Sequence, residues 1–194
     1  MKDNFMKVLT GIPLAALLFA APVSAASAQS IVYHSGMSHA ETCAERVSDP
    51  QEQSAYVLRL CKTALTDESL SPASRAATLT NTGIMEMRQG SLDAAVAHFQ
   101  AARAVDAASP DVAINLGAAL IRLGRFQEAI DVLHDPQAIS VGHRHIAYYN
   151  RAIAHWAVDD VALAYEDLSA ANALRPDYDA ARELLQHFQV AEVN

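Results

Sequence analysis

Basic side chains are scarce in this 194-residue sequence, which has 14 Lys and Arg against 22 Asp and Glu and a formal net charge of −8. Nucleic-acid binding depends on a basic footprint that neutralises phosphates, so this balance argues against a DNA or RNA partner. It argues more weakly against anionic membrane surfaces. We therefore expect no nucleic-acid partner.

Catalytic and metal-binding motifs are also missing. The sequence has no glycine-rich phosphate loop and no nucleophile elbow. Of the eight histidines, only His143 and His145 are closely spaced; His134 precedes them and His155 follows them, each about ten residues away. No cysteine or carboxylate spacing completes a known metal site around them. We therefore expect no enzyme and no cofactor, and metal binding stays a minor alternative centred on His143 and His145.

Only two cysteines occur, Cys43 and Cys61. In an exported protein an even pair usually forms a disulfide, which here would join the first two expected helices. The alternative is a pair of buried thiols that pack as small apolar groups. A terminal unit of a repeat array lacks a neighbour on one side, so a covalent bond there has a physical reason.

The first 28 residues have the pattern of a secretory signal. Lys2 and Lys7 begin it, an apolar run covers 8–23, and small residues suited to cleavage follow at Ala25 and Ala28. A membrane anchor is the alternative, but a spanning helix needs about 20 apolar residues and this run is shorter. We expect cleavage after Ala25 or Ala28, export to the periplasm or beyond, and no stable membrane insertion afterwards.

The sequence does contain a repeat. One pattern of small and large apolar residues occurs three times at a spacing of 34 to 35 residues, and a fixed period of this length indicates stacked units. The first segment carries Gly83, Gly90, Leu92, Ala95, Phe99 and Ala102. The second carries Gly117, Gly124, Phe126, Ala129 and Leu133. The third carries Ala152, Asp159, Val161, Ala164, Leu168, Ala171 and Pro176.

Local signals predict where helices begin and end. Ser71-Pro72 and Ser109-Pro110 are suited to helix starts, whereas Gly90 and Gly124 are suited to helix ends. The next helices are expected near Leu92, Phe126 and Val161. Pro136 predicts that the helix before it ends early.

Further helices are expected on either side of the repeats. A lead-in (29–39) would precede a degenerate helix pair (40–70), whose second helix would begin at Asp49-Pro50. A last helix over 178–190 carries one apolar stripe and would cap the array.

The repeated positions resemble the tetratricopeptide repeat family over residues 49–190. That family has a small residue, a glycine between two helices, then an aromatic residue or leucine, alanine, a large apolar residue, alanine and proline. The third segment departs from it because Ala152 and Asp159 replace the two glycines. The resemblance implies an all-α fold, a right-handed α-solenoid of antiparallel helix pairs, with about three repeats and the capping helix in 71–190.

In each repeat we expect a small residue where the two helices meet, a second small residue opposite it, and a large apolar residue toward the next repeat. The three sets are Gly83, Ala95 and Phe99; Gly117, Ala129 and Leu133; and Ala152, Ala164 and Leu168. These positions are predicted to be core positions without a binding role.

An asparagine stands two residues before each small residue of the first helix: Asn81, Asn115 and Asn150. The resemblance implies that this face lines a concave groove, where an amide both donates to and accepts from the backbone of a bound peptide. The alternative is that each asparagine forms hydrogen bonds within the array.

Other candidate groove residues follow on the same helices. Arg88 and Arg122 come seven residues after Asn81 and Asn115, and two arginines there would suit a carboxylate, unless they are ordinary solvated charges. Tyr149 and Trp156 are expected near the same face, as aromatic anchors or as core residues.

The sequence therefore predicts a non-enzymatic exported adaptor that binds a peptide segment of another envelope protein in its groove. The main alternative is a structural subunit that docks through its convex or terminal face into an envelope complex.

Overall fold

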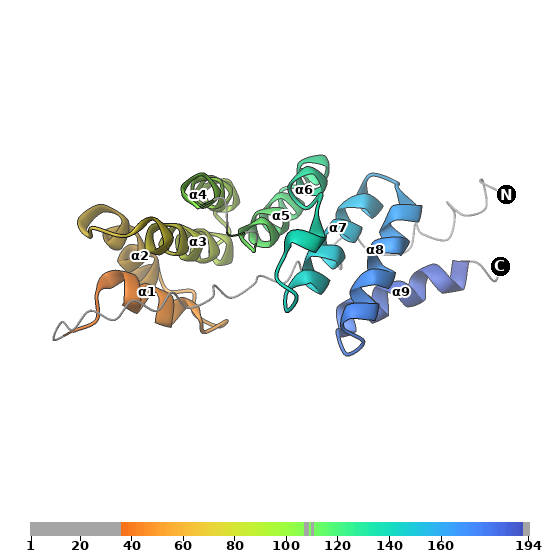
Figure 1. Cartoon of the computed structure of the whole chain (residues 1–194), viewed down its shortest axis with the longest axis horizontal. Helices are drawn as coiled ribbons and strands as arrows, with labels where there is room; N and C mark the ends of the chain where they lie inside the picture. Colours follow the sequence, from red (N-terminus) through yellow and green to blue (C-terminus); the bar gives the residue numbers. More distant parts are fainter. Residues whose placement is uncertain (1–35, 107–108, 110, 192–194) are drawn as a thin grey trace.

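The computed structural model describes residues 36–106, 109 and 111–191. The expected signal sequence lies outside these residues, as does most of the expected lead-in. The regular structure of the described residues is all helical, without a β-strand. In order, the helices are α1 (His39–Val47), α2 (Ala55–Asp67), α3 (Pro72–Arg88), α4 (Leu92–Val105), α5 (Val112–Arg122), α6 (Phe126–Val132), α7 (Arg144–Ala157), α8 (Val161–Leu174) and α9 (Asp179–Ala191) (Figure 1).

The helices form consecutive pairs that follow one another along the long axis of the molecule (Figure 1). Helices α3 and α4, α5 and α6, and α7 and α8 pack against each other, and each pair contacts the next. Helices α1 and α2 precede the first pair, and α9 packs on α8 at the other end. We call α3, α5 and α7 the first-helix row. No helix among the described residues is both long and apolar enough to cross a membrane.

The turns inside the three pairs share one backbone conformation. Gly90, Gly124 and Asp159 have positive φ angles of 83°, 73° and 63°, respectively. Glycine adopts this left-handed conformation without steric cost, and aspartate is one of the few other residues that tolerates it. The predicted helix starts at Leu92, Phe126 and Val161 are all confirmed, because this turn chemistry is local.

The two helices of a pair approach closely at the glycines of the first-helix row. A Cβ atom added to Gly83 would lie 2.6 Å from Phe99 Cε1, and one added to Gly117 would lie 2.6 Å from Leu133 Cδ1. Phe99 and Leu133 therefore pack on the glycine of their own pair. The missing side chain of each glycine leaves the space that the large residue occupies within the pair.

One expected helix start differs from the structure. Helix α2 begins at Ala55, with Ser54 as its N-cap, and not at Asp49-Pro50. Helix α5 begins at Val112, after Asp111, and Pro110 of its expected start lies outside the described residues. By contrast, α6 ends at Val132, before Pro136, as the proline predicts.

A disulfide joins Cys43 of α1 to Cys61 of α2, as the sequence predicts. Both cysteines are 0% exposed and belong to the core that continues through the array. The bond therefore closes the N-terminal helix pair from the inside.

Candidate functional site

The three asparagines lie on successive members of the first-helix row, as the repeat predicts. Asn81, Asn115 and Asn150 are buried, with 3%, 2% and 0% of their surface exposed. The expectation of exposed groove residues therefore differs from the structure. The physical reason is that α3 and α5 are enclosed: residues 78–87 and 112–121 are buried without exception.

Asn150 differs from an ordinary core asparagine. Its Oδ1 and Nδ2 atoms are buried, and neither has a hydrogen-bond partner among the described residues. Each buried polar group left without a partner costs about 1–3 kcal/mol, so native proteins rarely leave one unpaired. The Asn150 amide is therefore the group in this row that most clearly lacks a partner.

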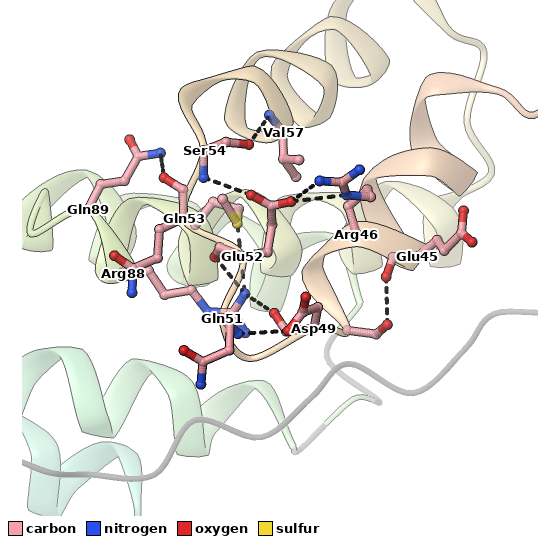
Figure 2. A network of polar contacts seen from close by, with 12 residues as sticks. Glu45, Arg46, Asp49, Gln51, Glu52, Gln53, Ser54, Val57, Arg88 and Gln89 are labelled. Carbon is pink, nitrogen blue, oxygen red and sulfur yellow. Dashed lines mark hydrogen bonds and ion pairs between the residues drawn. The ribbon is translucent and has the colours of Figure 1, made fainter.

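Arg88 binds backbone and is not free for a carboxylate (Figure 2). Its Nη1 donates to the carbonyl oxygens of Asp49 at 3.0 Å and Glu52 at 3.2 Å, and its Nη2 donates to that of Val47 at 3.1 Å. Burial lowers the pKa of Arg88, and the nearby Asp49 and Glu52 carboxylates oppose this shift. Arg88 therefore holds the α1–α2 loop, which explains why Asp49-Pro50 does not begin a helix.

Arg122 has the equivalent role in the following repeat, where its Nη1 donates to the Met87 carbonyl oxygen at 2.9 Å. In the third pair, Arg151 Nη1 donates to the carbonyl oxygens of Leu133 and His134, at 3.3 and 2.7 Å. The last carbonyls of a helix lack partners within that helix. Arg122 therefore donates to a carbonyl in the last turn of α3, and Arg151 donates to two carbonyls just after the end of α6, a role that the sequence interpretation missed.

Glu52 completes the α1–α2 loop (Figure 2). Its carboxylate accepts hydrogen bonds from the Ser54 backbone N–H at 2.8 Å and from Arg46 Nε at 3.0 Å. The hydrogen bonds from Ser54 and the Arg46 guanidinium lower the pKa of Glu52 to about 2. Gln89 Nε2 ties the same loop to α3 through the Gln53 carbonyl oxygen at 3.1 Å.

The two candidate aromatic residues face the C-terminal cap. The Tyr149 ring is 6% exposed and meets Tyr178 edge-on at 5.3 Å, while Trp156 meets Phe188 at 5.6 Å. Burial raises the pKa of Tyr149. Both residues therefore pack between α7 and the C-terminal segment, which favours the core interpretation.

Ser140, His143 and Asp111 meet in a cluster that resembles a catalytic triad in composition only. Ser140 Oγ lies 3.1 Å from His143 Nδ1, and Asp111 Oδ2 lies 3.0 Å from the same nitrogen. A triad requires the serine and the carboxylate on opposite ring nitrogens, so this arrangement does not relay a proton. The cluster instead fastens the 136–143 segment to the start of α5. In the described portion of the chain, no group of three or more His, Cys, Asp or Glu residues is suited to hold a metal ion.

Glu86 is a buried charge that the sequence interpretation missed. Its carboxylate lies 2.8 Å from Lys62 Nζ and 2.9 Å from His98 Nδ1, so it connects α2, α3 and α4. The repeat could have revealed it: the equivalent residue of the next repeat, 34 positions later, is the apolar Leu120, so a glutamate at this position is unusual within the array.

The comparison with known families agrees with this geometry. Residues 86–147, from the last turn of α3 to the first turn of α7, match the family model for the tetratricopeptide repeat. No curated protein matches the chain. Residues 86–147 therefore form a tetratricopeptide repeat region, and α3–α4, α5–α6 and α7–α8 repeat the same turn in the same register.

Proposed function

We propose that the chain is a non-enzymatic exported adaptor that binds a peptide segment of another envelope protein along the first-helix row. Tetratricopeptide repeats suggest a role in protein–protein interaction, and the match covers α5 of this row with the last turn of α3 and the first turn of α7. The Cys43–Cys61 disulfide supports export, because disulfides persist mainly in oxidising compartments.

The Asn150 amide is the observation that carries the proposal. It offers one acceptor and two donor hydrogens in a buried place, without a partner among the described residues. A peptide bond presents one N–H and one C=O, so the main chain of a bound segment supplies both kinds of partner. Asn81 and Asn115 stand at the equivalent positions of the two preceding units.

The test is capture of a partner by the mature chain, residues 29–194, from an envelope extract, with mass spectrometry as the readout. Asn150→Ala is expected to reduce capture of the wild-type partner strongly, whereas Asn172→Ala on the partly buried side of α8 serves as the matched control. Thermal unfolding of both variants excludes loss of fold. Equal capture by wild type and Asn150→Ala contradicts the proposal.

One observation favours a second candidate, a structural subunit that docks through its outer surface. Leu163, Tyr165 and Leu174 of α8 are 42%, 39% and 44% exposed. Leu163→Glu with Leu174→Glu tests this candidate in the same experiment. Loss of capture in that variant, with normal capture by Asn150→Ala, favours docking over peptide binding.

A further inference from the structure

The turn from α7 to α8 and the first turns of α8 leave apolar side chains at the surface. Val158 and Tyr165 are 40% and 39% exposed, and Ala162 is exposed as well. At the positions equivalent to Tyr165 in the two preceding units, Val96 is 4% exposed and Ile130 is partly buried. Helices α4 and α6 are each followed by a complete helix pair, whereas α8 packs against the single helix α9. The last unit therefore exposes apolar surface that the preceding units largely bury.

Aromatic rings continue this surface toward α9. The Tyr165 ring meets the Phe188 ring at 6.2 Å, and Trp156, near the end of α7, meets the same ring at 5.6 Å. Phe188 is 4% exposed, so it supports Tyr165 from the inside while Tyr165 keeps ring surface in contact with solvent. An exposed ring held in this way can receive an apolar side chain or the cationic group of Lys or Arg.

The same segment is acidic and has no neighbouring cation in the sequence. Between Ala152 and Leu174 there are four carboxylates and no lysine or arginine. Asp167 is buried in an ion pair with an arginine of α7, and Asp160 lies 3.7 Å from a histidine of α7. Asp159 and Glu166 are exposed, and neither has a hydrogen bond or ion pair within the part of the chain that the structure describes.

Asp159 also has an unfavourable backbone conformation for a residue with a side chain. Its φ of 63° lies in the left-handed region, where the other two turns have Gly90 and Gly124. Glycine adopts this conformation without steric cost, whereas other residues lose free energy there. The fold does not require the Asp159 carboxylate, because glycine serves at the same position of the other turns.

We propose that the surface formed by Val158, Asp159, Ala162, Tyr165 and Glu166 binds a segment of a partner protein in which Lys or Arg adjoins an apolar residue. The apolar residue covers the exposed apolar side chains, and the cation pairs with the free carboxylates and contacts the Tyr165 ring. This surface does not include the asparagines of the first-helix row. The inference therefore goes beyond peptide binding by that row, and it rests on the docking candidate, whose partner it names.

The charge of the surface disfavours two other occupants. In a symmetric dimer the same surface of both copies meets, which would bring the carboxylates of Asp159 and Glu166 against their own counterparts. An anionic membrane surface would be repelled by these carboxylates and by the net charge of −8. A basic segment of another protein meets neither penalty.

The probe is a display library of random 12-residue peptides, selected on residues 29–194. The selected peptides are expected to be rich in Lys, Arg and apolar residues. For the strongest synthetic peptide, Kd measured by fluorescence anisotropy is expected to rise by about fivefold or more between 50 and 500 mM NaCl, because salt screens exposed ion pairs.

Two variants test the surface directly. Asp159→Gly with Glu166→Gln removes both free carboxylates and is expected to raise Kd by about fivefold, the effect of two exposed ion pairs. Because the glycine matches the other two turns, thermal unfolding is expected to stay near that of the wild type. Tyr165→Ile introduces the residue found at the equivalent position, Ile130, and is expected to raise Kd by about threefold through loss of the ring.

The matched control is Asp67→Asn with Asp93→Asn, which removes the same charge from exposed positions on α2 and α4. It is expected to leave Kd within about twofold of wild type, because these carboxylates lie outside the surface. Selection of acidic or uncharged peptides overturns the inference. Equal effects of the control and of Asp159→Gly with Glu166→Gln overturn it as well, since only the net charge would then matter.

The remaining outcomes separate this inference from peptide binding by the first-helix row. Binding that Asn150→Ala abolishes and that Asp159→Gly with Glu166→Gln leaves intact overturns the inference and supports the row. The reverse pattern supports the inference and contradicts the row. Failure to select any peptide overturns the inference, as does dimerisation in analytical ultracentrifugation that Tyr165→Ile abolishes, because a second copy would then cover the surface.

Discussion

At the residue scale, the absence of a side chain determines how each helix pair packs. Gly83 and Gly117 occupy equivalent places in α3 and α5, and each leaves space for one large residue of the partner helix. Protein interiors are packed as densely as organic crystals, so an added methyl group at such a contact is not absorbed freely. The repeat therefore requires glycine at these two positions, because a larger residue would clash with the partner helix.

Gly83→Ala is expected to destabilise the protein by roughly 1–3 kcal/mol, because the new Cβ would lie 2.6 Å from the Phe99 ring. The better helix propensity of alanine offsets only about 1 kcal/mol of this strain. Urea denaturation measures the change. Gly142→Ala is the control, since a Cβ there meets nothing within 4 Å, and it is expected to stay within about 0.5 kcal/mol of wild type. Equal stability of the two variants would contradict the steric argument.

Asn150 shows where prediction from sequence ends at this scale. The repeat register placed the three asparagines correctly on the first-helix row, because register depends only on spacing. Their burial depends on how neighbouring helices enclose α3, α5 and α7, which spacing does not encode. The partners of Arg88 and Arg122 were missed for the same reason: a carbonyl oxygen is present at every residue and leaves no mark in a sequence.

At the scale of elements, the structure shows which signals are local. Helix starts at Leu92, Phe126 and Val161 were predictable because a glycine or aspartate in the left-handed conformation ends the preceding helix. The start of α2 was not, although Asp49-Pro50 is a good helix-start sequence. Hydrogen bonds from Arg88, 36 to 41 residues away, fix that segment as a loop.

The same loop predicts a pH dependence of stability. The folded pKa of Glu52 is about 2 and its ordinary value is 4.5. Because this pKa is depressed, Glu52 contributes its full share to the free energy of unfolding above about pH 4.5, and this contribution is lost as the pH falls from there toward 2. Urea midpoints at pH 7 and pH 3 are expected to differ less in Glu52→Gln than in wild type.

The control for this pH experiment is Glu166→Gln, which changes an exposed glutamate of α8. It is expected to keep the acid sensitivity of wild type. An unchanged pH response in Glu52→Gln would contradict the assignment, and other carboxylates with a lowered pKa, such as Asp111, would then account for acid destabilisation.

At the scale of the whole molecule, the array has two unlike ends. The C-terminal end is covered by α9, whose buried Ala181, Leu184 and Phe188 form the apolar stripe that the sequence predicted. The N-terminal end instead carries a covalent bond within its own helix pair. In a stacked array each unit contacts only its neighbours, so each end needs its own stabilising feature to prevent unfolding from that end.

The disulfide gives the clearest test of this view. Cys43→Ala with Cys61→Ala is expected to lower the free energy of unfolding by about 3 kcal/mol, the chain-entropy value for a loop of this size. If stability is a sum of units and their interfaces, the loss belongs mainly to the N-terminal end. Amide hydrogen exchange is expected to accelerate in α1, α2 and the adjoining α3, and to remain near wild-type rates in α8 and α9. An equal acceleration in all helices would show instead that the array opens as one cooperative body, and the disulfide would then stabilise the whole molecule and not its first unit.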